Sequence, residues 1–99
     1  MRIIGGSLKG KIILPPPEFK ARPTTDVAKE ALFNILDNEF EFEGLNVLDL
    51  FSGTGSISYE FASRGVGHVW SVEMNQQYSS FIKDQAKKLG LKNLTAVHH

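Results

Sequence analysis

The chain has 99 residues, which suits one small domain and is shorter than most complete α/β nucleotide-binding domains. It contains no cysteine, so disulfides and thiolate chemistry are excluded, and it has no apolar run long enough to cross a membrane. Its first residues lack the long apolar stretch of a secretory signal. We therefore expect a cytoplasmic globular protein that does not act on membranes.

The net charge of zero is unevenly distributed. Residues 1–29 carry six basic and two acidic side chains, a net charge of +4, and the remaining residues carry −4. A basic segment on an acidic body is typical of proteins with a polyanionic partner. A solvated hairpin that uses lysines for solubility and edge protection has the same composition. Charge alone favours this second interpretation.

The amino-terminal residues predict a short β-hairpin. Arg2–Ile4 and Lys11–Leu14 are its expected strands, separated by a glycine-containing turn. Pro15–Pro17 end it, because proline has no amide donor with which to continue a ladder. We therefore separate a hairpin arm at residues 1–22 from a body at residues 23–99.

The body is predicted to open with a helix from Thr24 or Thr25 to about Phe40. A threonine hydroxyl can cap the free amides, and Asp26 suits the positive end of the helix dipole. The apolar residues expected on its inner face are Ala28, Leu32, Ile35 and Leu36.

Strands then alternate with helices. Residues 46–51 predict a buried parallel strand, and 68–73 and 93–97 predict two further strands. Helices are expected at 56–64 and 75–89, each followed by glycine. This alternation indicates βαβ units, and therefore the first half of a doubly wound parallel sheet.

A glycine turn follows the first of these strands. Gly53 and Gly55 permit a tight turn and let backbone amides approach a ligand. A dinucleotide fingerprint requires a third glycine or alanine, but Ser58 stands there. Asp49 would repel a pyrophosphate and suits an ammonium group. The pattern therefore favours a ligand that is cationic near the turn, over NAD or a flavin.

A second carboxylate stands at the end of the next strand. Glu73 is placed to accept hydrogen bonds from ribose hydroxyls, since ligands of such sheets bind at the carboxyl ends of the strands. Met74 is suited to lie against an adenine ring. A strand-end acid without a ligand would look the same in isolation, but combined with the glycine turn it predicts an adenosine site.

Residues 47–57 and 69–75 resemble the first two motifs of class I S-adenosylmethionine-dependent methyltransferases. Met1–Gly10 and Arg22–Leu36 are similar to the amino-terminal signature of the bacterial 16S rRNA guanine-N2-methyltransferases, the RsmD family. The resemblance covers essentially the whole chain, and the Arg22–Leu36 block makes it family-specific. It implies a Rossmann-like class I methyltransferase fold. It also implies an enzyme that transfers a methyl group to the exocyclic N2 of a guanine.

The resemblance also implies a cofactor, a partner and their sites. S-adenosyl-L-methionine would be bound by Asp49, Phe51, Ser52, Gly53, Thr54, Gly55, Glu73 and Met74. Ribosomal RNA, or a small-subunit assembly particle, would be contacted mostly through phosphates by Arg2, Lys9, Lys11, Lys20 and Arg22. Arg22, Thr24 and Thr25 either help to close the cofactor site or serve only as helix cap and loop.

The chain departs from the family pattern in its second half. Family members carry an Asn/Asp-Pro-Pro-Tyr/Phe loop after the fourth strand, which orients the target amine and stacks on the flipped base. No proline follows Asn46, so we name no catalytic residue and expect the chain alone to be inactive. The strand at 46–51 would then be an exposed edge through which the chain self-associates.

Other functions stay open as alternatives. They are an NAD- or flavin-binding oxidoreductase domain and a non-enzymatic RNA-binding fragment. No metal site is expected, because the adjacent His98 and His99 lack a carboxylate partner in the sequence.

Overall fold

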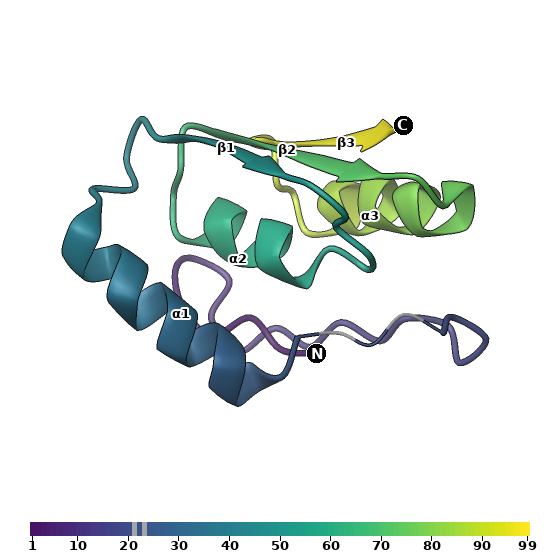
Figure 1. The fold of residues 1–99 in the computed structure, drawn as a ribbon, viewed down its shortest axis with the longest axis horizontal. Helices are drawn as coiled ribbons and strands as arrows, with labels where there is room; N and C mark the ends of the chain where they lie inside the picture. Colours follow the sequence, from purple (N-terminus) through teal and green to yellow (C-terminus); the bar gives the residue numbers. More distant parts are fainter. Residues whose placement is uncertain (21, 23) are drawn as a thin grey trace.

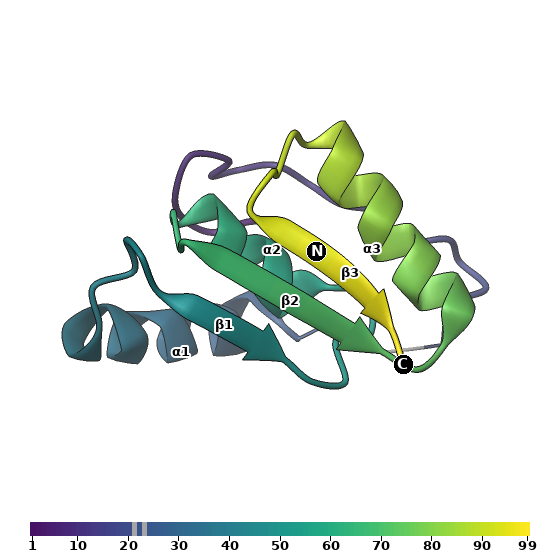
Figure 2. The same ribbon diagram turned by 90° about the horizontal axis from the view of Figure 1, so that it is seen from above.

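The computed structural model describes residues 1–20, 22 and 24–99. In chain order its elements are α1 (Asp26–Glu39), β1 (Asn46–Asp49), α2 (Ser56–Ser63), β2 (His68–Glu73), α3 (Gln76–Lys88) and β3 (Leu94–His98). The strands form one parallel sheet in the order β1-β2-β3, as Figure 2 shows. The structure thus confirms the predicted alternation of parallel strands and helices.

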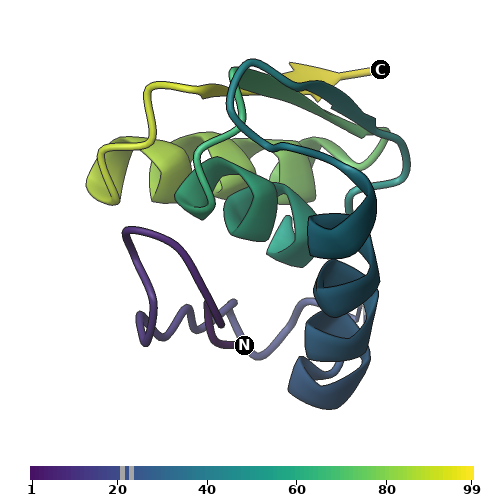
Figure 3. The same cartoon turned by 90° about the vertical axis from the view of Figure 1, so that its left-hand side faces the viewer.

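Helices cover one face of this sheet. Figures 1 and 3 show α2 and α3 beneath the strands, with α1 at the side and the amino-terminal segment below the helices. Within β2, Val69 and Ser71 are fully buried and Trp70 between them is exposed, as the alternating side-chain directions of a strand require. In the described residues no helix lies over the opposite face.

The first strand differs from its prediction as a buried strand. It ends at Asp49, and Leu48 and Leu50 are 63% and 56% exposed. The reason is its position: β1 pairs only with β2 in the described part of the chain, and its outward face has no second layer. Among the described residues, the expectation that this strand forms an exposed edge is confirmed.

Of the four residues predicted for the inner face of α1, only Leu36 is partly buried against the core. Ala28, Leu32 and Ile35 are exposed, whereas Lys29 and Phe33 are the buried residues of this helix. The Phe33 ring packs edge-on against Phe61, with ring centroids 4.7 Å apart. The buried face is rotated by about one residue, because a lysine with a buried partner occupies a position that apolar spacing alone leaves outside.

The amino-terminal hairpin is reduced to a single antiparallel bridge between Arg2 and Ile12. Ile3 and Ile13 flank it and are almost completely buried in the core. Residues 1–14 therefore pack against the helices instead of projecting from them (Figure 3). The predicted boundary between arm and body lies partly outside the described residues, since positions 21 and 23 are not described.

The connector after the prolines runs along α3. The Phe19 ring lies 4.7 Å from that of Tyr78, and the Lys20 amide donates to the Tyr78 hydroxyl (2.9 Å). Thr25 then caps α1 by accepting from the Ala28 amide (3.2 Å). No helix among the described residues is long and apolar enough to cross a membrane.

Candidate functional site

The carboxyl ends of β1 and β2 bring the glycine turn and Glu73 together. One oxygen of Glu73, Oε1, accepts from the Gly53 amide (2.8 Å), and Oε2 accepts from the Asn75 amide (2.6 Å). An ionised carboxylate offers about four acceptor positions, so capacity remains for hydroxyl groups of a ligand. Glu73 thus holds the turn in place and can still accept hydrogen bonds from a ligand.

The turn has the backbone conformation that its glycines predict. Gly53 and Gly55 have φ angles of 60° and 91°. A Cβ on Gly55 would lie 2.7 Å from Cζ of Tyr59, so this position requires glycine for packing as well as for conformation. The predicted glycine turn is confirmed.

Phe51 is a strained residue in the same loop. Its φ of 58° lies in the left-handed region, which costs a non-glycine residue roughly 1–2 kcal/mol, and its side chain is 89% exposed. Strain of this kind persists where the surrounding structure enforces it and is frequent at functional sites. No residue pattern in the sequence indicates this conformation of Phe51.

Asp49 is held by Ser58, the serine at the position where a dinucleotide fingerprint has its third glycine. Ser58 is buried and donates through its hydroxyl to Oδ2 of Asp49 (2.6 Å). A second hydrogen bond joins the hydroxyls of Ser58 and Ser71 (2.8 Å). Ser58 thereby ties the aspartate to α2 and β2. A signal for this role was available: a small polar residue in the first turn of α2, after a strand that ends in a carboxylate.

Burial raises the pKa of Asp49, and hydrogen bonds from the side chains of Ser58 and Ser52 only partly oppose the shift. Within the part of the chain that the structure describes, none of the ion pairs involves this carboxylate. Asp49 is therefore a partly desolvated acid that a cationic ligand group would stabilise.

A cavity of about 130 Å³ lies against the turn. Its lining combines the end of β1 and the glycine loop with two connector residues, and comprises Arg22, Thr24, Asp49, Phe51, Ser52, Gly53, Thr54, Ser56 and Ile57. Typical ligand pockets measure roughly 300–1,000 Å³, so this cavity has room for only part of a ligand of ordinary size. Arg22 and Thr24 do reach the site, Thr25 serves as the helix cap, and Met74 is exposed outside this cavity.

The five predicted RNA-binding residues are all exposed. Arg2 and Lys9 line one hollow together with Arg64, whereas Arg22 lines the cavity at the glycine turn. Lys29, which contributed to the positive charge of residues 1–29, is buried against Glu60. The basic surface is therefore smaller than the composition indicated.

The family model described as conserved hypothetical protein 95 matches residues 1–99. The chain belongs to this family, the RsmD family. Ribosomal RNA small subunit methyltransferase D of Buchnera aphidicola is 31% identical over 97 residues, which cover 98% of this chain and 49% of that protein. An uncharacterized methylase of Rickettsia prowazekii is 34% identical over 99 residues, covering 94% and 42% respectively.

A solved structure gives the same result for the fold. The protein yhhF of Escherichia coli superposes with a TM-score of 0.84 at 31% identity, covering 99% of this chain and 51% of its own. The predicted Rossmann-like class I methyltransferase fold is thus confirmed, and this chain forms the first half of its parallel sheet. The RsmD-family chain spans about half the length of these relatives.

Proposed function

We propose that this RsmD-family protein binds S-adenosyl-L-methionine and serves the transfer of its methyl group to the exocyclic N2 of a guanine in 16S ribosomal RNA. The observation that carries the proposal is the pair of carboxylates flanking the glycine turn. Asp49 is partly buried without an ion-pair partner among the described residues, and Glu73 has acceptor capacity left beside the turn.

The charges in the cavity match an amino acid. Asp49 and Arg22 line the same small cavity, so an ammonium and a carboxylate of one ligand each find an opposite charge. These are the two charged groups at the methionine end of S-adenosylmethionine. The ribose would then lie toward Glu73, at the end of the neighbouring strand.

A phosphate-containing cofactor fits less well. In a dinucleotide site the amides of the glycine turn point at the pyrophosphate. Here the Gly53 amide donates to Glu73 (2.8 Å), and the Gly55 amide donates to the Ser52 carbonyl (2.9 Å). Two carboxylates stand beside the turn as well. These contacts support S-adenosylmethionine over NAD or a flavin.

The RNA substrate is supported by the relatives and by the surface. The relative from Buchnera is named as a ribosomal RNA small subunit methyltransferase, and the predicted phosphate-contacting residues are all exposed. We propose ribosomal RNA, alone or in a small-subunit assembly particle, as the partner. Self-association through the edge of β1 stays a prediction.

The test of the cofactor is a comparison of two ligands by isothermal titration calorimetry. S-adenosylhomocysteine, which retains the ammonium, carboxylate and ribose groups, should bind, and NAD at the same concentrations should not. Binding of NAD alone would contradict the proposal and support the oxidoreductase alternative. Binding of neither would leave the non-enzymatic alternative.

The affinity for S-adenosylhomocysteine should fall as the pH is lowered, starting above the usual titration range of an aspartate. Because burial raises the pKa of Asp49, its carboxylate is protonated at a higher pH than an exposed one, and the neutral acid no longer pairs with an ammonium. The stability of the unliganded protein should depend on pH in the opposite direction. The stability contributed by protonated Asp49 is complete at low pH and is lost as the pH rises through its folded-state pKa.

Calorimetry over a series of pH values checks this expectation, with Asp49→Asn as the matched variant. The amide keeps an acceptor for Ser58 but carries no charge, so its affinity should be low and vary less with pH. An unchanged affinity in Asp49→Asn would exclude an ammonium contact at this position.

A further inference from the structure

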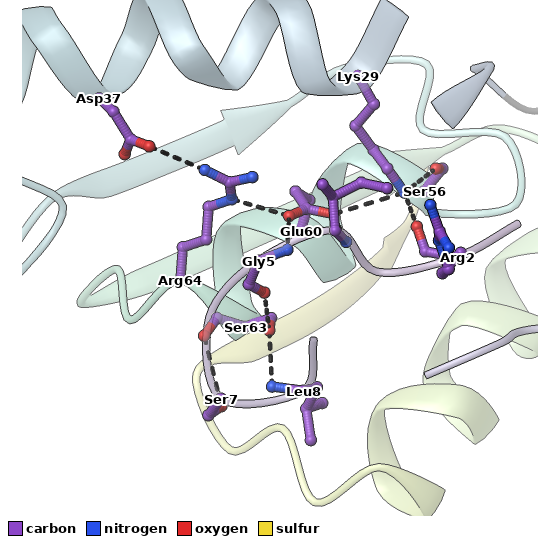
Figure 4. Close-up of polar contacts among 11 residues, drawn as sticks. Arg2, Gly5, Ser7, Leu8, Lys29, Asp37, Ser56, Glu60, Ser63 and Arg64 are labelled. Atoms are coloured by element: carbon purple, nitrogen blue, oxygen red, sulfur yellow. Dashed lines mark hydrogen bonds and ion pairs between the residues drawn. The ribbon is translucent and has the colours of Figure 1, made fainter. Parts of the chain in front are cut away.

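A buried ion pair connects α1 with α2. The side chains of Lys29 and Glu60 are 1% and 0% exposed, and Nζ lies 3.5 Å from Oε1 (Figure 4). The Lys29 ammonium also donates to the Arg2 carbonyl and to the Ser56 hydroxyl (3.1 Å). All three of its donors are therefore used, one on the amino-terminal backbone and two on α2.

Glu60 is saturated in the same way. Its Oε1 accepts from the Ile4 amide (2.9 Å), and its Oε2 accepts from the Gly5 amide (2.8 Å) and from Nε of Arg64 (2.8 Å). The amino-terminal backbone is thus bound by a side chain that is itself bound by Lys29. Removal of Glu60 would leave the Lys29 ammonium without a charged partner and two amides without their acceptor, whereas Glu60 without Lys29 would keep Arg64.

A second anchor, which shares Gly5 with the first, holds the following residues at the other end of α2. The Ser63 hydroxyl donates to the Gly5 carbonyl (2.7 Å) and accepts from the Leu8 amide (2.9 Å). The Ser7 amide donates to the Ser63 carbonyl (2.8 Å). In the described residues no hydrogen bond joins Ser63 to Lys29 or to Ser56, so this anchor supplies a control.

The ion pair positions the neighbouring residues more than it stabilises the fold. Burial lowers the pKa of Lys29, and the charge of Glu60 opposes this only in part, so the surroundings disfavour the charged form of Lys29. Apolar residues of the same size often serve such a position as well or better. What they would not supply is a hydrogen bond to Ser56, the first residue of α2, which lines the cavity beside Gly53 and Thr54.

We propose that Lys29 and Glu60 are positioning residues that tie Ser56, and with it the glycine turn, to the backbone of residues 2–5. Ligand binding at the turn and docking of the amino-terminal segment then stabilise each other. The ligand in this inference is the one given by the proposed function, on which it rests. Since coupling between two sites is reciprocal, it is measurable at either end.

The experiment combines calorimetry with residue-resolved amide hydrogen exchange, using S-adenosylhomocysteine as the ligand. Saturating ligand should slow exchange of the Ile4 and Gly5 amides by about fivefold or more. In Lys29→Met, which alters no residue of the cavity lining, the dissociation constant should rise by a similar factor and the slowing should disappear. If this variant does not fold, Ser56→Ala removes the same hydrogen bond and leaves the ion pair in place.

Ser63→Ala is the matched control. It should speed exchange at Leu8 without changing the dissociation constant or the ligand effect at Ile4 and Gly5. If Lys29 has a purely structural role, Lys29→Met should lower stability but leave the ligand effect on exchange at Ile4 and Gly5 intact. This result would overturn the inference. So would ligand binding to the unaltered protein without slower exchange at Ile4 and Gly5, which leaves the proposed function standing. Absence of any ligand binding would overturn both.

Discussion

Replacing Glu60 by alanine should lower the free energy of unfolding by about 3–5 kcal/mol, a large fraction of the stability of a small domain. The substitution leaves the Lys29 ammonium in the interior with only a carbonyl and a hydroxyl as partners. It also removes the acceptors of the Ile4 and Gly5 amides. Urea unfolding followed by circular dichroism measures the change.

Asp37→Ala is the matched control for this experiment, because it cuts the same network at its solvent end. Asp37 Oδ2 lies 2.9 Å from Nη1 of Arg64, and its side chain is 52% exposed. An exposed pair contributes at most about 1 kcal/mol. The double variant Lys29→Met/Glu60→Leu should recover part of the loss, since no charge is then stranded. Equal effects of Glu60→Ala and Asp37→Ala would show that Glu60 is not buried with Lys29 in solution.

The parts of the fold that the sequence predicted well depend on local patterns. The second strand was expected at residues 68–73, where β2 lies, and α2 begins at Ser56 as expected. Apolar periodicity, glycine stops and capping side chains act within a few residues of one another, so one sequence suffices to recognise them. The glycine turn belongs to the same class, because positive φ angles restrict the residue type directly.

Contacts between distant residues left no comparable pattern. Lys29 and Glu60 meet across 31 positions of the chain, and a lysine on a helix is ordinarily solvated. The hairpin shows the consequence for the backbone. The amides of Ile4 and Gly5 donate to Glu60, and those of Ser7 and Leu8 donate to Ser63, so these residues do not extend the ladder.

The general position of the candidate site was predicted because its residues lie at or next to the ends of strands. Asp49 and Glu73 are the last residues of parallel strands, Gly53 and Gly55 follow the first of these strands, and the topology places such residues at one edge of the sheet. Ser58 and Ser56 act through hydrogen bonds to other elements. Their roles depend on tertiary positions that residue spacing does not encode.

Replacing Glu73 by alanine should weaken binding of S-adenosylhomocysteine by more than about a hundredfold. Hydrogen bonds to a charged group contribute about 1.5–3 kcal/mol each, and two contacts to ribose hydroxyls would be lost. The substitution also releases the amides of Gly53 and Asn75, so the turn and the start of α3 lose a common acceptor. Calorimetry of the two proteins gives the ratio of dissociation constants.

Two further variants separate the loss of the Glu73 hydrogen bonds from the change in net charge. Glu43→Ala removes an exposed carboxylate from the connection between α1 and β1, with the same change in net charge, and should leave the affinity unchanged. Glu73→Gln keeps one acceptor oxygen, enough for either the Gly53 amide or a ribose hydroxyl, so its affinity should fall between those of the unaltered protein and Glu73→Ala. If Glu73→Ala binds as tightly as Glu43→Ala, the ribose does not lie at the end of β2 and the ligand must be placed elsewhere along the turn.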